Sequence, residues 1–190
     1  MRAHDTPPSG PRPGSPAVPL LVRPRTGADL DACADVLAAV HAHSSYPANW
    51  PADPAGWLSP PALEAAWVAV SGADGGDGAV IGHVVLCRAT PDDLAAHLWS
   101  ERTGTDPSAT AVVSRLFVSP AARGRGAGAR LLAAAVDAAR AAGRHPVLDV
   151  LASDTSARAL YERLGWRPLG TAGQEWGPGQ VVTLHCYAAG

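Results

Sequence analysis

The chain has 190 residues, of which 47% are hydrophobic, and its formal net charge is −2. This length and composition suit one α/β domain that buries a real core. The near-neutral charge gives no global field that would draw the chain to nucleic acid or to an acidic membrane surface. All 15 basic residues are arginine, so lysine is excluded as a base, a Schiff-base former or a phosphate ligand.

The three cysteines, Cys33, Cys87 and Cys186, are widely spaced and form neither a disulfide framework nor a zinc motif. We expect each to be a small buried hydrophobe. No apolar run approaches the ~20 residues of a membrane span, and the N-terminus lacks the apolar stretch of a secretory signal. The sequence therefore favours a cytoplasmic protein without a metal.

Proline, glycine and serine dominate residues 1–19, which we expect to be a disordered tail, with a single domain over 20–190. Hydrophobic periodicity and turn signals predict the elements of that domain. Strands are expected over 20–24, 67–70, 79–88, 111–118, 147–151, 166–169 and 180–187. Helices are expected over 29–43, 60–66, 91–101, 126–142 and 155–164.

The strand over 111–118, the helix over 126–142 and the strand over 147–151 make a βαβ unit with a right-handed crossover. The strands over 67–70 and 79–88 are instead joined by a glycine-rich hairpin loop. A parallel unit beside a hairpin predicts an α/β fold with a mixed sheet.

The most informative segment is the loop Arg123-Gly-Arg-Gly-Ala-Gly128, which lies between a strand and a helix. Its glycines let the backbone turn sharply and let a ligand approach the main chain. The N–H groups of a helix's first turn lack partners within the helix and, with the dipole, bind phosphate. Arg123, Arg125 and Arg130 add charge that pairs with phosphate oxygens. The loop therefore predicts a phosphorylated ligand.

Two nucleotide-binding motifs compete for this loop. A P-loop is excluded because it requires a lysine. A dinucleotide-binding Rossmann loop has the spacing GxGxxG and an acid about 20 residues further on, a position that Asp149 occupies. Here the spacing is GxGxG, and five residues, Ser119 to Arg123, separate the strand from the first glycine. The Rossmann binder thus remains only a weaker alternative.

A second motif, Asp154-Thr-Ser-Ala157-Arg-Ala-Leu160-Tyr161-Glu-Arg-Leu-Gly165-Trp166, follows the loop. Together the two segments resemble the GCN5-related N-acetyltransferase (GNAT) family, whose signatures are R/Q-x-x-G-x-G/A and N-x-x-A-x-x-L-Y-x-x-x-G-F/W. The resemblance spans about residues 20–187 and is sharpest over 111–170. It implies a mostly antiparallel central sheet of six to seven strands flanked by about four helices, and acetyl-CoA as co-substrate.

In this family acetyl-CoA lies where two central strands part near a bulge, and pantetheine pairs with strand main chain like an added strand. The resemblance places the cofactor on two stretches and two side chains. These residues are Leu116, Phe117, Val118, Arg123, Gly124, Arg125, Gly126, Ala127, Gly128, Ala129, Asp154 and Tyr161. Asp154 replaces the family's common asparagine; a carboxylate only accepts hydrogen bonds, but it still caps a helix.

Tyr161 matches the family's usual general acid, which protonates the leaving CoA thiolate; the alternative is a tyrosine that only packs on the helix face. Asp149 is the candidate base for the amine proton, because burial would raise its pKa. Equally, the proton could leave through water in the cleft. His83, His41 and His43 are weaker candidates for the base.

The resemblance implies a primary amine as acceptor, attacking the thioester directly, but the sequence does not identify it. The loop with Tyr46, Trp50, Asp53 and Trp57 either holds a cationic amine or covers the sheet edge. The segment 90–110 either borders the acceptor site or is a solvated face. A non-catalytic acyl-CoA sensor on the same fold is the alternative function. A homodimer is compatible with the fold.

Overall fold

The computed structural model describes residues 19–72, 78–176 and 179–190. The expected disordered tail over 1–19 lies outside this part of the chain except for its last residue. The same holds for most of the glycine-rich hairpin loop. The prediction of disorder and flexibility there stays a prediction.

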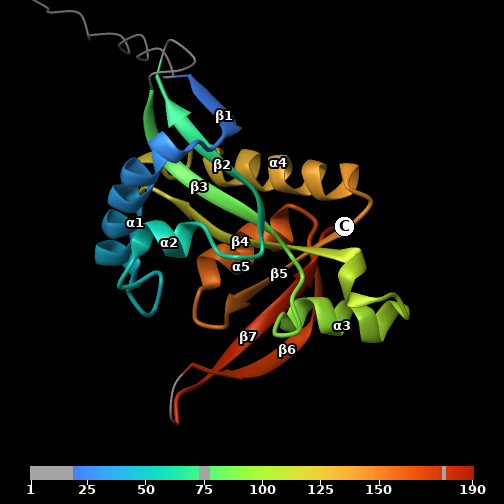
Figure 1. Cartoon of the computed structure of the whole chain (residues 1–190). Coiled ribbons are helices and arrows are strands. Elements are labelled where there is room, and N and C mark those ends of the chain that lie inside the picture. The colour runs from blue at the N-terminus through green and yellow to red at the C-terminus, as the bar shows by residue number, and fades with distance from the viewer. Residues whose placement is uncertain (1–18, 73–77, 177–178) are drawn as a thin grey trace, which may run out of the picture.

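A seven-stranded sheet forms the centre of the described structure, with the strand order β1-β2-β3-β4-β5-β7-β6 (Figure 1). The strands are β1 (Leu20–Pro24), β2 (Leu63–Ser71), β3 (Ala79–Arg88), β4 (Thr110–Val118), β5 (His145–Leu151), β6 (Arg167–Glu175) and β7 (Val181–Ala188). Neighbouring strands are antiparallel except β4 and β5, which are parallel. This confirms the mixed, mostly antiparallel sheet.

Five α-helices accompany the sheet in the described residues, close to the number of about four that the family resemblance implies. They are α1 (Leu30–Ser44), α2 (Pro54–Leu58), α3 (Leu94–Thr103), α4 (Ala127–Ala141) and α5 (Thr155–Arg163). α4 connects the two parallel strands, as the βαβ pattern predicts.

The prediction of a short helix over 60–66 is wrong. The helix lies earlier, at α2, because Asp53 accepts a hydrogen bond from the Gly56 N–H (3.0 Å) and Pro54 follows it. An aspartate followed by proline is an N-cap and N1 pair as good as the serine and proline at 59–60. The chain from Leu63 onward instead joins β2, because pairing with β3 outweighs local helix propensity.

The strand β6 is longer than the hydrophobic pattern indicates. A strand was expected only over 166–169, whereas β6 runs to Glu175 and pairs with β7 along its length. The segment Gly170-Thr-Ala-Gly-Gln174 has no alternation of apolar residues, so the period-2 signal is absent there. The resulting hairpin carries Trp176 to the side of the sheet where the cavities described below open.

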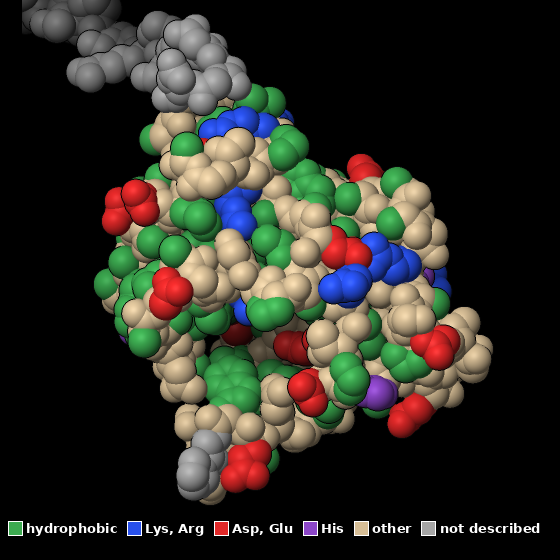
Figure 2. Space-filling model, viewed as in Figure 1, with side chains coloured by type: hydrophobic (Ala, Val, Ile, Leu, Met, Phe, Trp, Pro, Cys, Tyr) green, Lys and Arg blue, Asp and Glu red, His purple; other side chains and the backbone are tan. Residues whose placement is uncertain are grey.

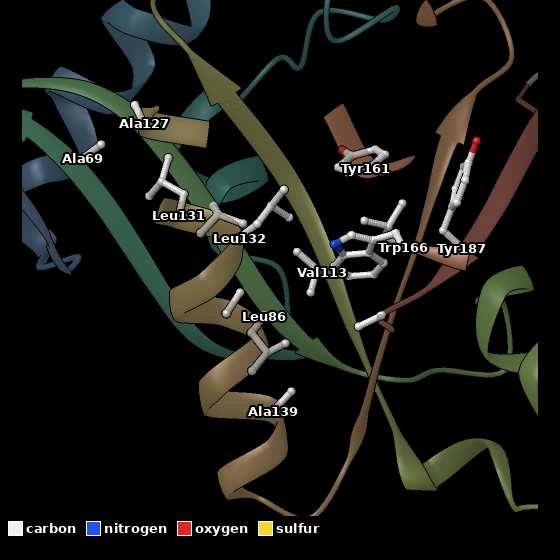
Figure 3. Close-up of a cluster of buried hydrophobic side chains, with 14 of the residues drawn as sticks. Ala69, Leu86, Val113, Ala127, Leu131, Leu132, Ala139, Tyr161, Trp166 and Tyr187 are labelled. Carbon is white, nitrogen blue, oxygen red and sulfur yellow. The ribbon is translucent and has the colours of Figure 1, made fainter. Parts of the chain in front are cut away.

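Helices cover the two faces of the sheet and bury different residues of the same strands. On one face, Leu131 and Leu132 of α4 and Tyr161 of α5 pack in one hydrophobic cluster with Trp166 (Figure 3). Leu148 of β5 belongs to the same cluster. On the opposite face α1, α2 and α3 pack on two further clusters, which include Val147, Cys186 and Phe117. Because side chains alternate along a strand, Asp149 shares the face of Val147 and not that of Leu148. The three cysteines are free and buried, as expected.

Candidate active site

A β-bulge interrupts β4 at Arg115. Along β3 and β4, His83 pairs with Phe117 and Val85 with Ser114, so one residue of β3 faces two of β4. Arg115 has a φ of 50°, in the left-handed region that few non-glycine residues adopt. A bulge of this kind bends its strand and disrupts the ladder.

The strands β4 and β5 part beside this bulge. Their parallel pairing joins Thr110–Val112 to His145–Val147, yet β4 continues to Val118 and β5 to Leu151. Within the described residues, the second half of β4 therefore has strand pairing only on its β3 side. This leaves a slot on the β5 side of β4, which Leu116 lines, and a strand edge without a partner is the geometry that an added extended ligand requires.

A cavity of about 420 Å³ opens at this slot. Its walls come from the loop after α1, from β4 and β5, from α5 and from the β6–β7 hairpin. They include Tyr46, Trp57, Arg115, Leu116, Asp149, Asp154, Tyr161 and Trp176. Figure 2 shows a hollow in the surface with acidic side chains at its bottom and an apolar wall beside them. The cavity brings Asp149, Asp154 and Tyr161 together with residues distant in sequence, such as Tyr46 and Trp176.

A second cavity of about 430 Å³ lies on the side of α3. It shares Val113, Ser114, Arg115 and Asp149 with the first cavity. Asp93, in the segment 90–110, lines it as well. Asp149 and Arg115 therefore stand where the two cavities meet.

Asp149 is open to the cavities, yet protein surrounds it on most sides. This loss of hydration raises the pKa of its carboxyl to about 6, and the nearby negative charge of Asp93 adds to the effect. A carboxyl with this pKa accepts a proton more readily than an ordinary aspartate and is still largely ionised at neutral pH.

Tyr161 is 7% exposed and reaches the first cavity from the other face of the sheet. Its ring lies 6.0 Å from the rings of both Trp166 and Tyr187 (Figure 3). Burial is the largest cause that raises the pKa of its phenol above the usual value, so the group stays protonated at neutral pH. Tyr161 and Asp149 thus border one cavity from opposite faces of the sheet.

The arginine and glycine loop leads into α4 as the sequence predicts. Gly124 and Gly126 have φ values of 76° and 81°, which glycine adopts without strain. The first hydrogen bond at the helix start runs from the Arg130 N–H to the Gly126 carbonyl (3.1 Å). Among the described residues, the N–H groups of Ala127, Gly128 and Ala129 consequently have no partner inside the helix. A Cβ on Gly128 would come within 3.3 Å of Leu160.

Not every charged residue near this loop is available to a ligand. Arg130 donates to the Leu20 carbonyl (2.7 Å) and so ties α4 to β1. Arg125 lies 3.5 Å from the Ser71 hydroxyl, whereas Arg123 is exposed. Asp154 caps α5, since its carboxylate accepts from the Ala157 N–H (2.9 Å). That cap satisfies the role expected of an aspartate at this position.

The loop expected to wall the acceptor site divides into two parts. Tyr46 and Trp57 line the first cavity, with ring centroids 6.2 Å apart. The Trp50 ring is tilted against that of His41, with centroids 5.2 Å apart, outside the residues that line the cavity. Sequence reasoning missed Arg115 and Trp176; a charged residue inside the apolar run of β4 was the available signal for Arg115.

His83 has both ring nitrogens occupied and is fully buried. Arg25 always carries its protons, so it donates to Nε2 (3.0 Å); Nδ1 then holds the hydrogen and donates to the Arg115 carbonyl (3.2 Å). Burial lowers the pKa of this imidazole to about 4. His41 likewise bonds the Pro47 carbonyl through Nδ1 (3.0 Å). These contacts give His83 and His41 structural roles, and neither lines the cavities.

A sequence profile of the acetyltransferase (GNAT) family matches residues 36–166, more than half of the chain. The chain belongs to this family. It is accordingly an acyltransferase, and the resemblance seen in its two motifs is confirmed.

Solved structures of GNAT proteins share the fold. Arabidopsis thaliana NAA60 in complex with acetyl-CoA is 21% identical with a TM-score of 0.67, covering 90% of this chain and 97% of that one. A GCN5-related N-acetyltransferase from Kribbella flavida is 24% identical (TM-score 0.61; 89% and 96% covered). The ribosomal-protein-S18-alanine N-acetyltransferase of Escherichia coli is 17% identical (TM-score 0.61; 90% and 92% covered). A search of curated protein sequences gave no significant match.

The described ranges of this GNAT chain hold no cluster of three or more His, Cys, Asp or Glu side chains suited to a metal ion. Each helix in these ranges is too short or too polar to span a lipid bilayer.

Proposed function

We propose that the chain is an acetyl-CoA-dependent N-acetyltransferase that moves the acetyl group to a primary amine by direct attack. The observation that carries this proposal is the open slot at the β4 bulge, where Asp149 and Tyr161 border one cavity. The thioester would lie between these two side chains, and the amine would approach from the face of the sheet that carries Asp149.

The proposed cofactor site follows the two family motifs. Pantetheine pairs with the main chain of Leu116, Phe117 and Val118, the part of β4 that lacks a partner on the β5 side. The pyrophosphate lies on the loop from Arg123 to Ala129, where free N–H groups and the dipole of α4 favour anions. NAA60 of Arabidopsis, a structural neighbour, was solved with acetyl-CoA, which supports this donor.

The reaction begins when the acceptor ammonium loses a proton to Asp149, directly or through a water in the cleft. The amine lone pair then forms a C–N bond to the thioester carbonyl carbon, and the carbonyl electrons move onto oxygen. A main-chain N–H at the bulge stabilises this oxyanion, the kind of interaction that contributes most to acyl transfer. Asp149 suits the first step because its pKa lies near the working pH.

Collapse of the intermediate breaks the C–S bond and releases CoA as a thiolate. Tyr161 donates its phenolic proton to the sulfur, and the second proton that the attacking nitrogen loses as the amide forms returns to the phenolate, directly or through water. The raised pKa of Tyr161 favours this role, because the side chain is protonated before the step. The products are the acetylated amine and CoA with a free thiol.

The test combines binding and turnover on the purified full chain. Acetyl-CoA is mixed with a panel of amino acids, polyamines, peptides and amino sugars, and release of the CoA thiol is followed with a thiol reagent. We expect amine-dependent release for at least one class. Tight acetyl-CoA binding without turnover of any amine would instead identify an acyl-CoA-binding module.

A further inference from the structure

Arg115 occupies a position where its backbone is strained and its side chain faces the cavities. In a regular strand, consecutive side chains point to opposite faces. The bulge interrupts this alternation, so that the side chains of Ser114 and Arg115 both project to the face of the sheet that α1 and α2 cover. At a φ of 50°, glycine or asparagine would cost less than arginine. A strained residue at a site points to a role for its side chain.

The Arg115 guanidinium is held in place but has no acidic partner among the described residues. Its central carbon lies 4.8 Å from the centre of the Trp57 ring, and Nη1 donates to the Ser114 hydroxyl (3.2 Å). Its Nε is buried and has no hydrogen-bond partner in the part of the chain that the structure describes. Within the described ranges, the ion pairs involve other arginines. Charged groups removed from water are almost always paired, so this fork is suited to an anion that binds from outside.

Neighbouring carboxylates do not fill this role. Asp93 accepts from the Thr90 N–H (2.6 Å) and hydroxyl (2.7 Å), and it stands before the first turn of α3. Asp149 lines the same two cavities as Arg115 but forms no ion pair with it in the described structure. Arg115 and Asp149 therefore present a positive and a negative group, with no ion pair between them in the described structure, at the point where the cavities meet.

We propose that the acceptor is a small amino acid whose carboxylate pairs with Arg115 while its amino group faces Asp149. This inference rests on the proposed N-acetyltransferase function and names its substrate class. A planar guanidinium binds a carboxylate through two parallel hydrogen bonds, which fixes the orientation of the substrate. A polyamine would bring a second positive charge to Arg115. A protein N-terminus would place a neutral peptide bond there and leave the guanidinium unpaired.

The test uses the twenty proteinogenic amino acids, each beside its own carboxamide, with acetyl-CoA and thiol detection. The carboxamide keeps the amine and the side chain and removes the negative charge, which also makes the amine less basic, so the two compounds are compared across a range of pH. We expect kcat/KM for the best amino acid to exceed that of its carboxamide by about 100-fold, the size of a lost charged hydrogen-bond pair. Arg115→Gln should abolish this preference, Arg115→Lys should keep part of it, and Arg163→Gln, on the exposed end of α5, should keep all of it.

Binding provides a readout that does not require turnover. Amino acids, but not carboxamides, should raise the melting temperature of the CoA-saturated wild-type chain, since a ligand stabilises the state it binds. The comparison needs no variant, so it stands even if Arg115→Gln folds poorly. Carboxamides that perform as well as amino acids in both assays would overturn the inference. Acetylation of those carboxamides would still uphold the transferase, whereas failure to bind CoA would remove both.

Discussion

The imidazole of His83 donates a hydrogen bond to the main-chain carbonyl of Arg115 (3.2 Å), so a buried histidine holds the β4 bulge. Arg25 fixes the ring from the other side and also donates to the Leu58 carbonyl (2.6 Å). One chain of contacts thus connects β1, the end of α2, β3 and the bulge. The slot between β4 and β5 depends on this arrangement, because it opens beside the bulge, where the two strands are no longer paired.

We first predict that His83 makes stability depend on pH. The pKa of His83 is lowered from 6.5 to about 4 by burial, so the unfolded chain takes up a proton first as the pH falls. Above pH 6.5 the ring is neutral in both the folded and the unfolded chain, and its full contribution to the free energy of unfolding is present. This contribution is lost as the pH falls towards 4, and the loss amounts to roughly 3 kcal/mol at most. In His83→Gln the amide can make both hydrogen bonds but does not titrate.

Urea unfolding of both proteins across this pH range measures the effect. The free energy of unfolding of wild type minus that of His83→Gln should fall as the pH decreases, and the subtraction removes contributions from other groups such as Asp149. A difference that stays constant with pH would show that the buried ring does not titrate in this way.

The second prediction concerns Tyr161. Tyr161→Phe removes only the phenolic hydroxyl, so kcat should fall about 100-fold while the Kd for acetyl-CoA stays within a factor of two or so. Tyr187→Phe is the matched control: its hydroxyl bonds Glu162 (2.9 Å) and lies outside the residues that line the cavities. We expect this control to lose about 1 kcal/mol of stability and no activity. An unchanged kcat in Tyr161→Phe would remove its role as the acid.

Asp149 should appear in the pH dependence of the reaction. The raised pKa of about 6 means that kcat/KM declines as the pH falls below 6, where the carboxyl becomes protonated and cannot accept the amine proton. In Asp149→Asn this decline of kcat/KM at acidic pH should disappear, and the rate should be about 100-fold lower than in the wild type. The acceptor's own ionisation gives a separate limb common to both proteins. If the acidic limb persists in Asp149→Asn, the proton leaves through water without this residue.

Two glycines at opposite ends of α4 allow the effect of a substitution on cofactor binding to be distinguished from its effect on backbone strain. Gly126 (φ 81°) precedes the helix and Gly143 (φ 71°) follows it, and a Cβ would meet no atom within 4 Å at either. Alanine should therefore cost about 1 kcal/mol of stability at both positions, from strain alone. Only Gly126→Ala should also weaken CoA binding, by about tenfold, because relaxation of the loop turns its N–H groups away from phosphate. Equal CoA affinities in the two variants would argue against the loop as the phosphate site.

The parts of the fold that the sequence predicted are those with strong local signals. The helix α4 has apolar periodicity and a glycine at each end, and the two family motifs carry side chains at fixed spacings. Asp149 was predictable as a lone acid in an apolar strand. Its position in a cavity with Tyr161 follows from alternation along β5 and from the fold, whereas the roles of the two residues as base and acid stay predictions.

What could not be predicted depends on contacts between distant segments. The start of β2 is fixed by pairing with β3, and β6 is a strand because β7 lies beside it. The orientation of Arg115 follows from the bulge, which reverses the usual alternation after Ser114, and this bulge is supported by His83 from another strand. No periodicity in the sequence carries that information.

The central claim is that the slot beside β4 and the loop before α4 hold acetyl-CoA. Isothermal titration calorimetry of the full chain with acetyl-CoA, and separately with CoA, tests it most directly. The account predicts saturable binding of one molecule per chain for both ligands, weakened in Gly126→Ala and preserved in Gly143→Ala. The titration is run at two well-separated temperatures, because the binding enthalpy can pass through zero at one of them. Absence of binding heat at both temperatures with millimolar ligand would contradict the claim.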